Sequence, residues 1–216
     1  MSDAARLDGL TLPADFQRVV GLTDEKIADL ERFRALLKAG NARMNLVGPS
    51  TLETFWARHV IDSAQLLWIA PEAREWADLG SGAGLPGLVL AILLRGVEGA
   101  HVHLIESMAK RCRFLEEVTV ALDLPAQVHN ARAESLKLKA QVVTARACAP
   151  LDRLLGFASP YLARGAKGLF LKGGEVDNEI AEARKTWSFK AATTPSLSDP
   201  RGRVLSIEEL TRVKRR

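Results

Sequence analysis

The stretch of the sequence best suited to chemistry is residues 76–87, which reads Trp-Ala-Asp-Leu-Gly-Ser-Gly-Ala-Gly-Leu-Pro-Gly. Four glycines fall within eight residues, directly after the acidic Asp78. Glycine lacks a Cβ atom, so it lets the backbone turn sharply and approach a ligand closely. Where such a turn opens a helix, the free amide N–H groups of the helix also face the ligand. A tight turn without a ligand would need only one or two glycines, so the stretch predicts a ligand-binding turn.

The turn fits two classes of ligand. Residues 82–87 match the G-x-G-x-x-G pattern of dinucleotide binding, and Glu106 follows 19 residues later. Asp78 favours a different ligand, because a carboxylate repels a pyrophosphate and attracts a cation. S-adenosylmethionine carries a sulfonium and an ammonium group and no phosphate, and Glu106 could accept hydrogen bonds from its ribose hydroxyls. The residues therefore predict S-adenosylmethionine as the cofactor, with a dinucleotide as the alternative.

Nucleophilic and metal chemistry find less support in the sequence. The only cysteines, Cys112 and Cys148, are too few for a disulfide scaffold or a zinc site of four cysteines. A cysteine nucleophile for cytosine-C5 methylation needs an activated thiolate, but alanines flank Cys148, so we predict that both thiols are buried and structural. The scattered His101, His103 and His129 lack metal-ligand spacing, and we expect no metal site.

His59, Asp62 and Ser63 fall on neighbouring turns of a predicted helix. The three residue types are those of a hydrolytic catalytic triad, but side chains on one helix cannot adopt the convergent geometry of such a triad. Two interpretations remain open. The trio could form a polar contact between the N-terminal helices and the rest of the chain, or His59 could lie near a substrate or cofactor.

The elements that must position these residues alternate between strands and helices after Pro71. We predict strands at 75–79, 101–106, 127–131, 141–145, 168–171 and 204–213, and helices at 84–95, 108–122, 151–162 and 175–187. Before Pro71, one helix begins after Thr23 and stops at Gly40, and a second runs from about residue 50 to Trp68. This pattern predicts an α/β fold with a mostly parallel sheet and helices on both faces. We divide the chain into a helical cap at 1–70 and a main domain at 71–216, packed as one unit.

The composition is that of an ordinary globular protein, with 47% hydrophobic and 26% charged residues among 216. The longest apolar run, 83–94, is 12 residues long, whereas a membrane span needs ~20. The first six residues lack the features of a signal peptide. We therefore expect a soluble, cytoplasmic protein without a membrane partner.

The net charge of +4 comes entirely from one end of the chain. Residues 201–216 hold six basic and two acidic side chains, and the other 200 residues are neutral in sum. The tail could serve solubility or RNA binding, so the charge alone is weak support for a nucleic-acid partner.

Several stretches together resemble one family. Residues 78–87 resemble the cofactor motif of the RsmG family (also GidB, glucose-inhibited division protein B), bacterial small-subunit rRNA guanine-N7 methyltransferases with a class I Rossmann-like fold. The further matches, in the expected order along the chain, are 43–47 (Arg-Met-Asn-Leu-Val), 58–63 (Arg-His-Val-Ile-Asp-Ser), 106–107, 110–111, 114–115, 133–134, 144–147 (Thr-Ala-Arg-Ala) and 171–173. Many methyltransferases share the glycine motif, but its combination with 58–63 and 144–147 is specific to this family.

The resemblance implies a seven-stranded sheet and a set of site residues. Gly80 and Leu85 would line the cofactor, Ala133 and Glu134 would flank its adenine, and Arg146 would lie where the target base enters. The full set of expected cofactor residues is Asp78, Gly80, Gly82, Gly84, Leu85, Glu106, Ala133, Glu134 and Arg146.

The implied reaction transfers a methyl group to N7 of one guanine in the 530 loop of 16S rRNA, guanine 527 in this family. Guanine N7 carries an in-plane lone pair at neutral pH, so in-line positioning suffices and no protein nucleophile is needed. Arg146 is our candidate for positioning the base, and no residue is assigned as catalytic with certainty. Basic side chains at the same edge of the sheet could contact RNA phosphates; the candidates are Arg58, His59, Lys110, Arg111 and Lys172.

We expect the partner to be 16S rRNA, the small ribosomal subunit or its precursor, and the protein to be a monomer. The alternatives are a methyltransferase for a protein or small-molecule substrate, a dehydrogenase-type nucleotide-binding protein, and an RNA-binding module with a vestigial cofactor site.

Overall fold

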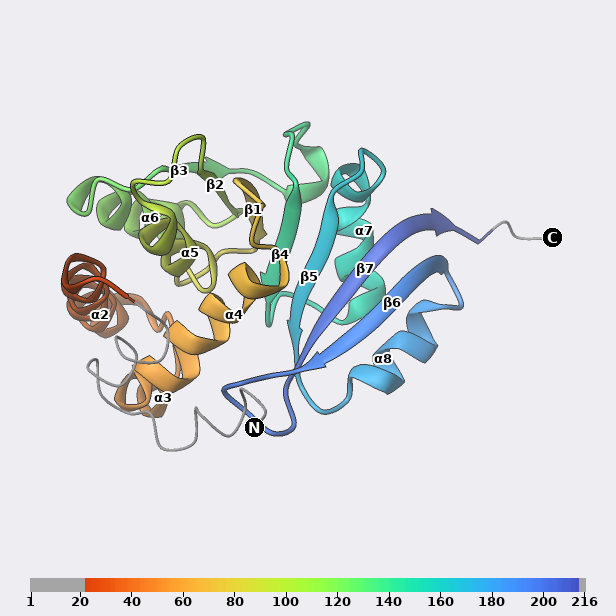
Figure 1. Ribbon diagram of the computed structural model, residues 1–216, viewed down its shortest axis with the longest axis horizontal. Helices are drawn as coiled ribbons and strands as arrows, with labels where there is room; N and C mark the ends of the chain where they lie inside the picture. Colours follow the sequence, from red (N-terminus) through yellow and green to blue (C-terminus); the bar gives the residue numbers. More distant parts are fainter. Residues whose placement is uncertain (1–21, 214–216) are drawn as a thin grey trace.

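A single seven-stranded sheet organises the computed structural model, which describes residues 22–213 (Figure 1). The strand order is β3-β2-β1-β4-β5-β7-β6. All strand pairs among β1, β2, β3, β4 and β5 are parallel, and β7 is antiparallel to both β5 and β6. The bounds are β1 Glu75–Leu79, β2 His101–Glu106, β3 Ala126–Asn130, β4 Val142–Arg146, β5 Lys167–Lys172, β6 Trp187–Pro195 and β7 Arg203–Arg212. The predicted α/β fold with a mostly parallel sheet is confirmed.

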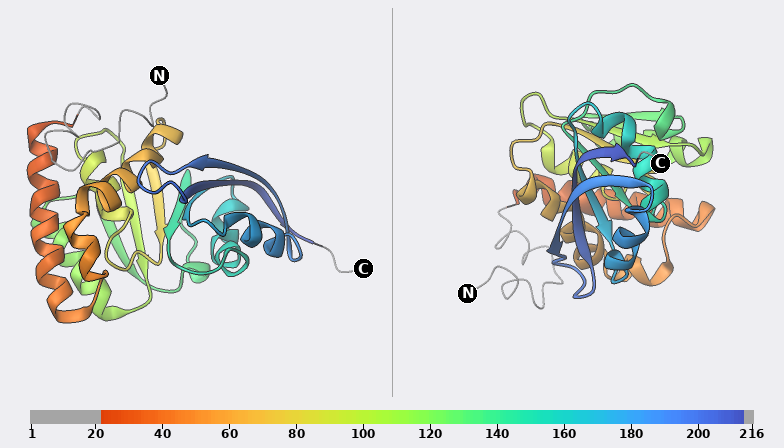
Figure 2. Two further views of the ribbon diagram at one scale, coloured as in Figure 1. Left: turned by 90° about the horizontal axis from the view of Figure 1, so that it is seen from below. Right: turned by 90° about the vertical axis from the view of Figure 1, so that its right-hand side faces the viewer.

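Helices pack against both faces of the sheet and build two hydrophobic clusters (Figures 1 and 2). The first cluster contains α5 Gly87–Leu94, α6 Ala109–Ala121 and the N-terminal elements α2 Asp24–Met44, η2 Trp56–Ile61 (a π-helix) and α4 Asp62–Ile69. The second contains α7 Leu151–Leu162 and α8 Val176–Ala183. Two short pieces complete the list, α3 Pro49–Glu53 and the 3-10 turn η3 Ala133–Ser135.

Alternation along each strand explains why the sheet is covered on both faces. In β1, Trp76 belongs to the first cluster, whereas Ala77 and Leu79 belong to the second. In β5, Leu169 belongs to the first cluster and its neighbour Phe170 to the second. Side chains of a strand point alternately to opposite faces, so apolar residues at successive positions need a hydrophobic layer on each side.

The helix expected to stop at Gly40 continues to Met44. Its start agrees with the prediction, because the Thr23 hydroxyl accepts a hydrogen bond from the Lys26 amide at 3.4 Å. A Cβ atom at position 40 would lie 2.8 Å from the Phe114 ring. Gly40 therefore lets α2 pack closely on α6, and Asn45, in the left-handed conformation with φ 47°, ends the helix.

Two other predicted helices differ from the structure. The helix from residue 50 to Trp68 is divided into α3, η2 and α4. The helix at 175–187 ends at Ala183, and β6 follows, a strand that we did not place on the sequence. Only Trp187 and Phe189 of β6 are buried, so this edge strand lacks the apolar pattern of the others.

The bounds of the remaining elements shift by a few residues. The helix expected from Gly84 begins at Gly87, since 80–86 form the turn before it. The division of the chain at residue 70 remains a prediction, and the parts of the cap and basic tail at 1–21 and 214–216 lie outside the described residues. Among residues 22–213, no helix combines the length and apolar character needed to cross a membrane.

Candidate functional site

The glycine turn connects β1 to α5 at the carboxyl end of the sheet. Gly80, Gly82 and Gly84 all have positive φ, of 68°, 55° and 82°. The amides of Gly80 and Ser81 both donate to the Ile105 carbonyl, at 2.8 and 3.0 Å. These bonds hold the turn against the end of β2, so the residues that follow the two strands lie close together.

Asp78 lies beneath the turn rather than at a ligand surface. Its side chain is fully buried, and its Oδ2 accepts a hydrogen bond from the Gly87 amide, the first residue of α5, at 3.1 Å. Burial raises the pKa of this carboxyl to about 7, and Glu106 adds to the shift. Asp78 lines neither of the cavities described below, so it acts on the turn through the helix amide.

Glu106 fixes the turn from the neighbouring strand. Its Oε2 accepts from the Gly82 amide at 3.1 Å and its Oε1 from the Met108 amide at 2.8 Å. Arg111 adds a weaker ion pair at 3.7 Å. Each carboxylate oxygen can accept further hydrogen bonds, and Glu106 lines a cavity, so its predicted contact with a cofactor is geometrically open.

That cavity, which we call the adenosine cavity after the role that we propose for it below, has a volume of about 80 Å³. Its wall includes four of the residues expected from the resemblance, Gly80, Glu106, Ala133 and Glu134. Leu85 instead packs into the first hydrophobic cluster, and neither Gly82 nor Gly84 lines the cavity. The wall also contains residues that the sequence analysis missed, Ser107, Arg132, Cys148 and Phe157.

Replacing Glu106 by glutamine is expected to weaken S-adenosylmethionine binding by ~10-fold. Glutamine offers one oxygen and one NH2 group, so one of the two backbone amides, of Gly82 or Met108, would lose its acceptor. Titration calorimetry measures the effect. The control is Glu117→Gln, because Glu117 is an exposed residue of α6 that pairs with Arg43 of α2. Equal affinities for the two variants would contradict the assignment of Glu106.

A larger cavity, of about 710 Å³, adjoins the adenosine cavity, and Cys148 lines both. We call it the base cavity, after the role that we propose for it below. Its wall comes from four parts of the chain that are far apart in sequence: η2 and the start of α4 (Arg58, Asp62), β4 and the loop after it (146–150), β5 and α8 (171–173, Glu179), and the β6–β7 loop (Ser196, Ser198, Asp199, Gly202).

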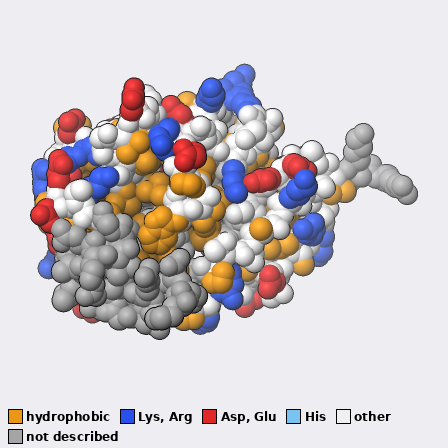
Figure 3. All heavy atoms as spheres, in the orientation of Figure 1, with side chains coloured by type: hydrophobic (Ala, Val, Ile, Leu, Met, Phe, Trp, Pro, Cys, Tyr) orange, Lys and Arg blue, Asp and Glu red, His pale blue; other side chains and the backbone are white. Residues whose placement is uncertain are grey.

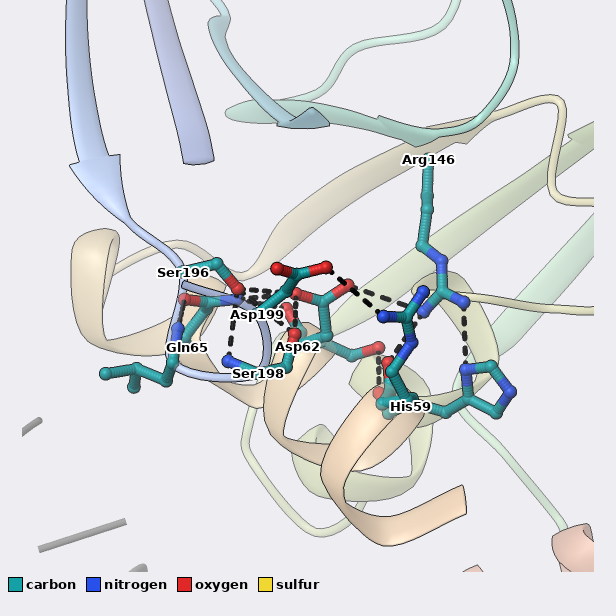
Figure 4. A network of polar contacts seen from close by, with 10 residues as sticks. His59, Asp62, Gln65, Arg146, Ser196, Ser198 and Asp199 are labelled. Atoms are coloured by element: carbon teal, nitrogen blue, oxygen red, sulfur yellow. Dashed lines mark hydrogen bonds and ion pairs between the residues drawn. The ribbon is translucent and has the colours of Figure 1, made fainter. Parts of the chain in front are cut away.

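Arg146, at the end of β4, is held at the wall of the base cavity by a cluster of polar contacts (Figure 4). Its Nη1 donates to the Arg58 carbonyl at 3.0 Å and lies 3.4 Å from the Asp62 carboxylate. Its Nη2 lies 2.9 Å from Nδ1 of His59. The side chain is 20% exposed and lines the larger cavity; its role in positioning a base remains a prediction.

His59 is fully buried, so its ring offers no surface to RNA in this structure. A guanidinium is always protonated and can only donate, which makes Nδ1 of His59 the acceptor and places the proton on Nε2. Burial, together with the positive charge of Arg146, lowers the pKa of His59 to about 3. The ring is therefore neutral at physiological pH.

The lowered pKa of His59 predicts a loss of stability in acid. Between about pH 6.5 and 3 the unfolded chain binds a proton that folded His59 does not, so the free energy of unfolding falls as the pH drops, by at most ~1.4 kcal/mol per pH unit. Denaturant unfolding across this range should show a shallower slope in His59→Asn than in the wild type. His103, whose pKa burial lowers to about 4, adds a slope of the same sign, and Asp78 one of opposite sign. The difference between the two proteins is the quantity to compare, and identical slopes would contradict the neutral, buried state of His59.

The β6–β7 loop is a part of the site that the sequence did not reveal. Ser196 and Ser198 donate to Oδ1 of Asp62 at 3.1 and 2.8 Å, and the Leu197 amide donates to Gln65 at 3.1 Å. Residues 198–202 (Ser-Asp-Pro-Arg-Gly) have a composition typical of a turn, but that signal does not say where the turn packs.

The remaining basic candidates separate into two groups. Arg58 is half exposed and pairs with Asp199 at 3.3 Å, and Lys172 is largely buried, with Glu179 at 2.6 Å. Both line the base cavity. Lys110 donates to the Arg43 carbonyl and Arg111 contacts Glu106, and neither lines the base cavity. On the face seen in Figure 3, basic and acidic side chains are interspersed, with no large area of one sign.

The prediction of two buried, structural cysteines is right for Cys112 and wrong for Cys148. Cys112 is buried, and its thiol donates to the Glu106 carbonyl. Cys148 is partly exposed, because it lies between the two cavities. Burial and the nearby acids Asp78 and Glu106 raise the pKa of its thiol, which disfavours a thiolate nucleophile.

The histidines on the strands form a small cluster away from the glycine turn. Nδ1 of His103 lies 3.0 Å from Nε2 of His129, and the His101 ring stacks edge-on against His103. Within residues 22–213, no group of three or more His, Cys, Asp or Glu side chains is arranged to hold a metal ion.

Comparison with known proteins identifies the family of the chain. Residues 26–203 match the model of the family described as rRNA small subunit methyltransferase G (GidB). The chain belongs to this family. A ribosomal RNA small subunit methyltransferase G from Caulobacter vibrioides is 63% identical over 201 residues, covering 93% of each chain. The protein of the same name from Methylorubrum populi is 46% identical and covers 85% of this chain and 89% of its own.

Solved structures share the fold of this methyltransferase G family member. A putative O-methyltransferase from Klebsiella pneumoniae aligns with a TM-score of 0.57 at 12% identity, covering 91% of this chain and 96% of its own. Magnesium protoporphyrin IX methyltransferase from Synechocystis, solved with bound SAM, aligns with a TM-score of 0.54 at 14% identity, covering 87% and 99%. The seven-stranded fold is thus that of S-adenosylmethionine-dependent methyltransferases.

Proposed function

We propose that this chain transfers a methyl group from S-adenosylmethionine to N7 of one guanine in the 530 loop of 16S rRNA, guanine 527 by family resemblance. The observation that carries the proposal is the pair of adjoining cavities at the carboxyl edge of the sheet. One is bounded by the glycine turn and Glu106, and the other by Arg146. A cofactor and a base bound on either side of Cys148 would meet at that residue.

The residues of the adenosine cavity fit S-adenosylmethionine. A Cβ atom at Gly80 would lie 2.7 Å from the Cys148 sulfur, so only glycine lets the turn and Cys148 approach this closely at the wall of the adenosine cavity. With about 80 Å³, the adenosine cavity is smaller than the ~300 Å³ of typical ligand sites. The cofactor would therefore place only part of its adenosine there, beside Glu106 and Ala133, and extend the rest of the molecule past Cys148.

The base cavity suits a guanine with its phosphate. The bound cofactor supplies an electrophilic methyl group on a sulfonium, and the base supplies the N7 lone pair. The protein would hold the base: Arg146 has donors free for guanine O6, and Arg58 can reach a phosphate at the rim. No side chain removes a proton in this step, because N7 carries none, so catalysis would rest on orientation and on exclusion of water.

The test combines purified protein with methyl-labelled S-adenosylmethionine and four substrates in parallel: small ribosomal subunits, naked 16S rRNA, bulk protein and small metabolites. Label recovered as 7-methylguanosine from subunits or rRNA supports the proposal and identifies the preferred form of the partner. Label in protein or metabolites would overturn the RNA substrate. No transfer, together with tight binding of NAD, would overturn the cofactor.

A further inference from the structure

Three contacts fix the guanidinium of Arg146, and all three come from one short segment, residues 58–62. They are the carbonyl of Arg58, the ring of His59 and the carboxylate of Asp62. The segment is the end of the π-helix η2 and the first residue of α4. π-helical turns inside helices are rare and are frequent at functional sites. Here the turn supplies the Arg58 carbonyl and the His59 ring, and the residue after it supplies the Asp62 carboxylate, to one guanidinium.

Burying the His59 ring is energetically unfavourable, and its contact with Arg146 gives a reason for a histidine at this position. The ring is fully buried, and its Nε2 has no hydrogen-bond partner among the described residues. A buried N–H without an acceptor is destabilising, and an apolar side chain at this position would avoid that cost. What an apolar side chain would lack is the acceptor at Nδ1, 2.9 Å from Arg146.

These three contacts, which we call the clamp, leave part of the Arg146 guanidinium without a hydrogen-bond partner in the described part of the chain. Both hydrogens of Nη1 have acceptors, and Nη2 uses one of its two on His59. The Nε–H group and the second hydrogen of Nη2 have no acceptor among residues 22–213. Since Arg146 lines the base cavity, these are the donors that a bound base can use.

Asp62 has a second role in the same cluster. Its Oδ1 accepts from Ser196 and Ser198 of the β6–β7 loop and from the side-chain amide of Gln65. Because that loop lines the base cavity, one carboxylate connects the guanidinium with the opposite wall (Figure 4).

We propose that His59 and Asp62 are positioning residues, which hold the Arg146 guanidinium in one orientation so that its remaining donors face the target base. The inference rests on the proposed function and assigns His59 to support of Arg146 instead of RNA contact. It also predicts which atom of His59 matters: Nδ1 as an acceptor.

The first experiment compares kcat and KM for methylation of small ribosomal subunits. His59→Leu is expected to lower kcat by ~30-fold with KM for the cofactor within ~3-fold. His59→Asn should recover most of the activity, because its Oδ1 replaces Nδ1 as the acceptor. The control is Phe55→Leu, which alters the packing against the His59 ring without touching Arg146. It should lower Tm and leave kcat unchanged. Equal loss of kcat in His59→Leu and Phe55→Leu would overturn the proposal.

A double-mutant cycle tests whether His59 acts through Arg146. Arg146→Lys keeps the positive charge but loses the planar fork. Adding His59→Leu or Asp62→Asn to this background should lower kcat by less than a further ~3-fold. The same ~30-fold loss in both backgrounds would show that the two residues act independently of Arg146 and would overturn the proposal.

A spectroscopic measurement does not depend on activity and keeps this inference separable from the proposed function. Nitrogen NMR of the wild type should show His59 protonated at Nε2 and unprotonated at Nδ1 from pH 5 to 8. A proton on Nδ1 would overturn the clamp even in an active enzyme. If the wild type methylates no RNA and the Nε2 tautomer is found, the proposed function fails and the positioning of Arg146 stands.

Discussion

Replacing Arg146 by alanine is expected to lower kcat for methylation of the small ribosomal subunit by ~100- to 1,000-fold. The guanidinium lies at the wall of the base cavity, and part of its donor set is not used by its contacts with residues 58–62. Loss of these donors removes the orientation of the base, whereas the contacts of the adenosine cavity remain. The affinity for S-adenosylmethionine should therefore stay within ~3-fold of the wild type.

This substitution also affects stability, so it needs a second variant. Alanine leaves Nδ1 of His59 and the Asp62 carboxylate without their buried donor, which costs ~1–3 kcal/mol. Arg146→Lys restores a positive charge beside Asp62 and should fold better, with kcat still reduced ~10- to 100-fold. The matched control is Arg34→Ala, which removes an exposed arginine of α2 that pairs with Glu31. A kcat for Arg146→Ala above about one third of the wild-type value would contradict a role in the base cavity.

Replacing Gly80 by alanine is expected to weaken S-adenosylmethionine binding by ~30-fold or more. Two effects combine at this position. The new Cβ would lie 2.7 Å from the Cys148 sulfur, and φ of 68° is strained for any residue with a side chain. The turn must shift to relieve the contact, and the wall of the adenosine cavity shifts with it. Titration calorimetry measures the loss.

Two variants separate the clash from the backbone strain. In Gly80→Ala with Cys148→Ala the sulfur is gone, and the nearest remaining atom, the Cβ of residue 148, lies at 3.5 Å, an ordinary contact. Affinity should recover to within ~5-fold of the wild type. Gly96→Ala has the same kind of strain, with φ of 81° and nothing within 4 Å of the new Cβ, so it should lower stability but not cofactor affinity. Wild-type affinity in Gly80→Ala, or no recovery in the double variant, would contradict the proposed path of the cofactor.

The sheet and its ligand-binding edge could be predicted from the sequence because the signals for them are local. Strand–helix alternation after Pro71 predicted β1 to β5 and β7, and the glycine turn predicted the edge at which the cavities lie. β6 escaped prediction because the residues that follow Phe189 in this strand, 190–195, are exposed. An edge strand with little buried surface has no apolar pattern to reveal it.

The base cavity could be predicted only in part, because its wall depends on contacts between distant segments. The sequence placed Arg146 and Arg58 at a common edge, but nothing local connects Asp62 with Ser198, 136 positions away. The burial of His59 and the position of Cys148 between the cavities are likewise consequences of packing. Polar residues in loops and at helix ends carry no periodic signal, so their partners emerge only when the chain is folded.

The central claim, methyl transfer to N7 of a guanine in the 530 loop, is tested most directly by cleavage of the product RNA. Methylation at N7 gives the base a positive charge, so borohydride reduction followed by aniline breaks the chain at the modified nucleotide. Small-subunit rRNA treated with the wild-type protein and S-adenosylmethionine should be cleaved at guanine 527, and rRNA treated with Arg146→Ala for the same time, just long enough for the wild-type reaction to finish, should stay largely intact there. Methyl incorporation without cleavage in the 530 loop, or cleavage at a different guanine, would contradict the account.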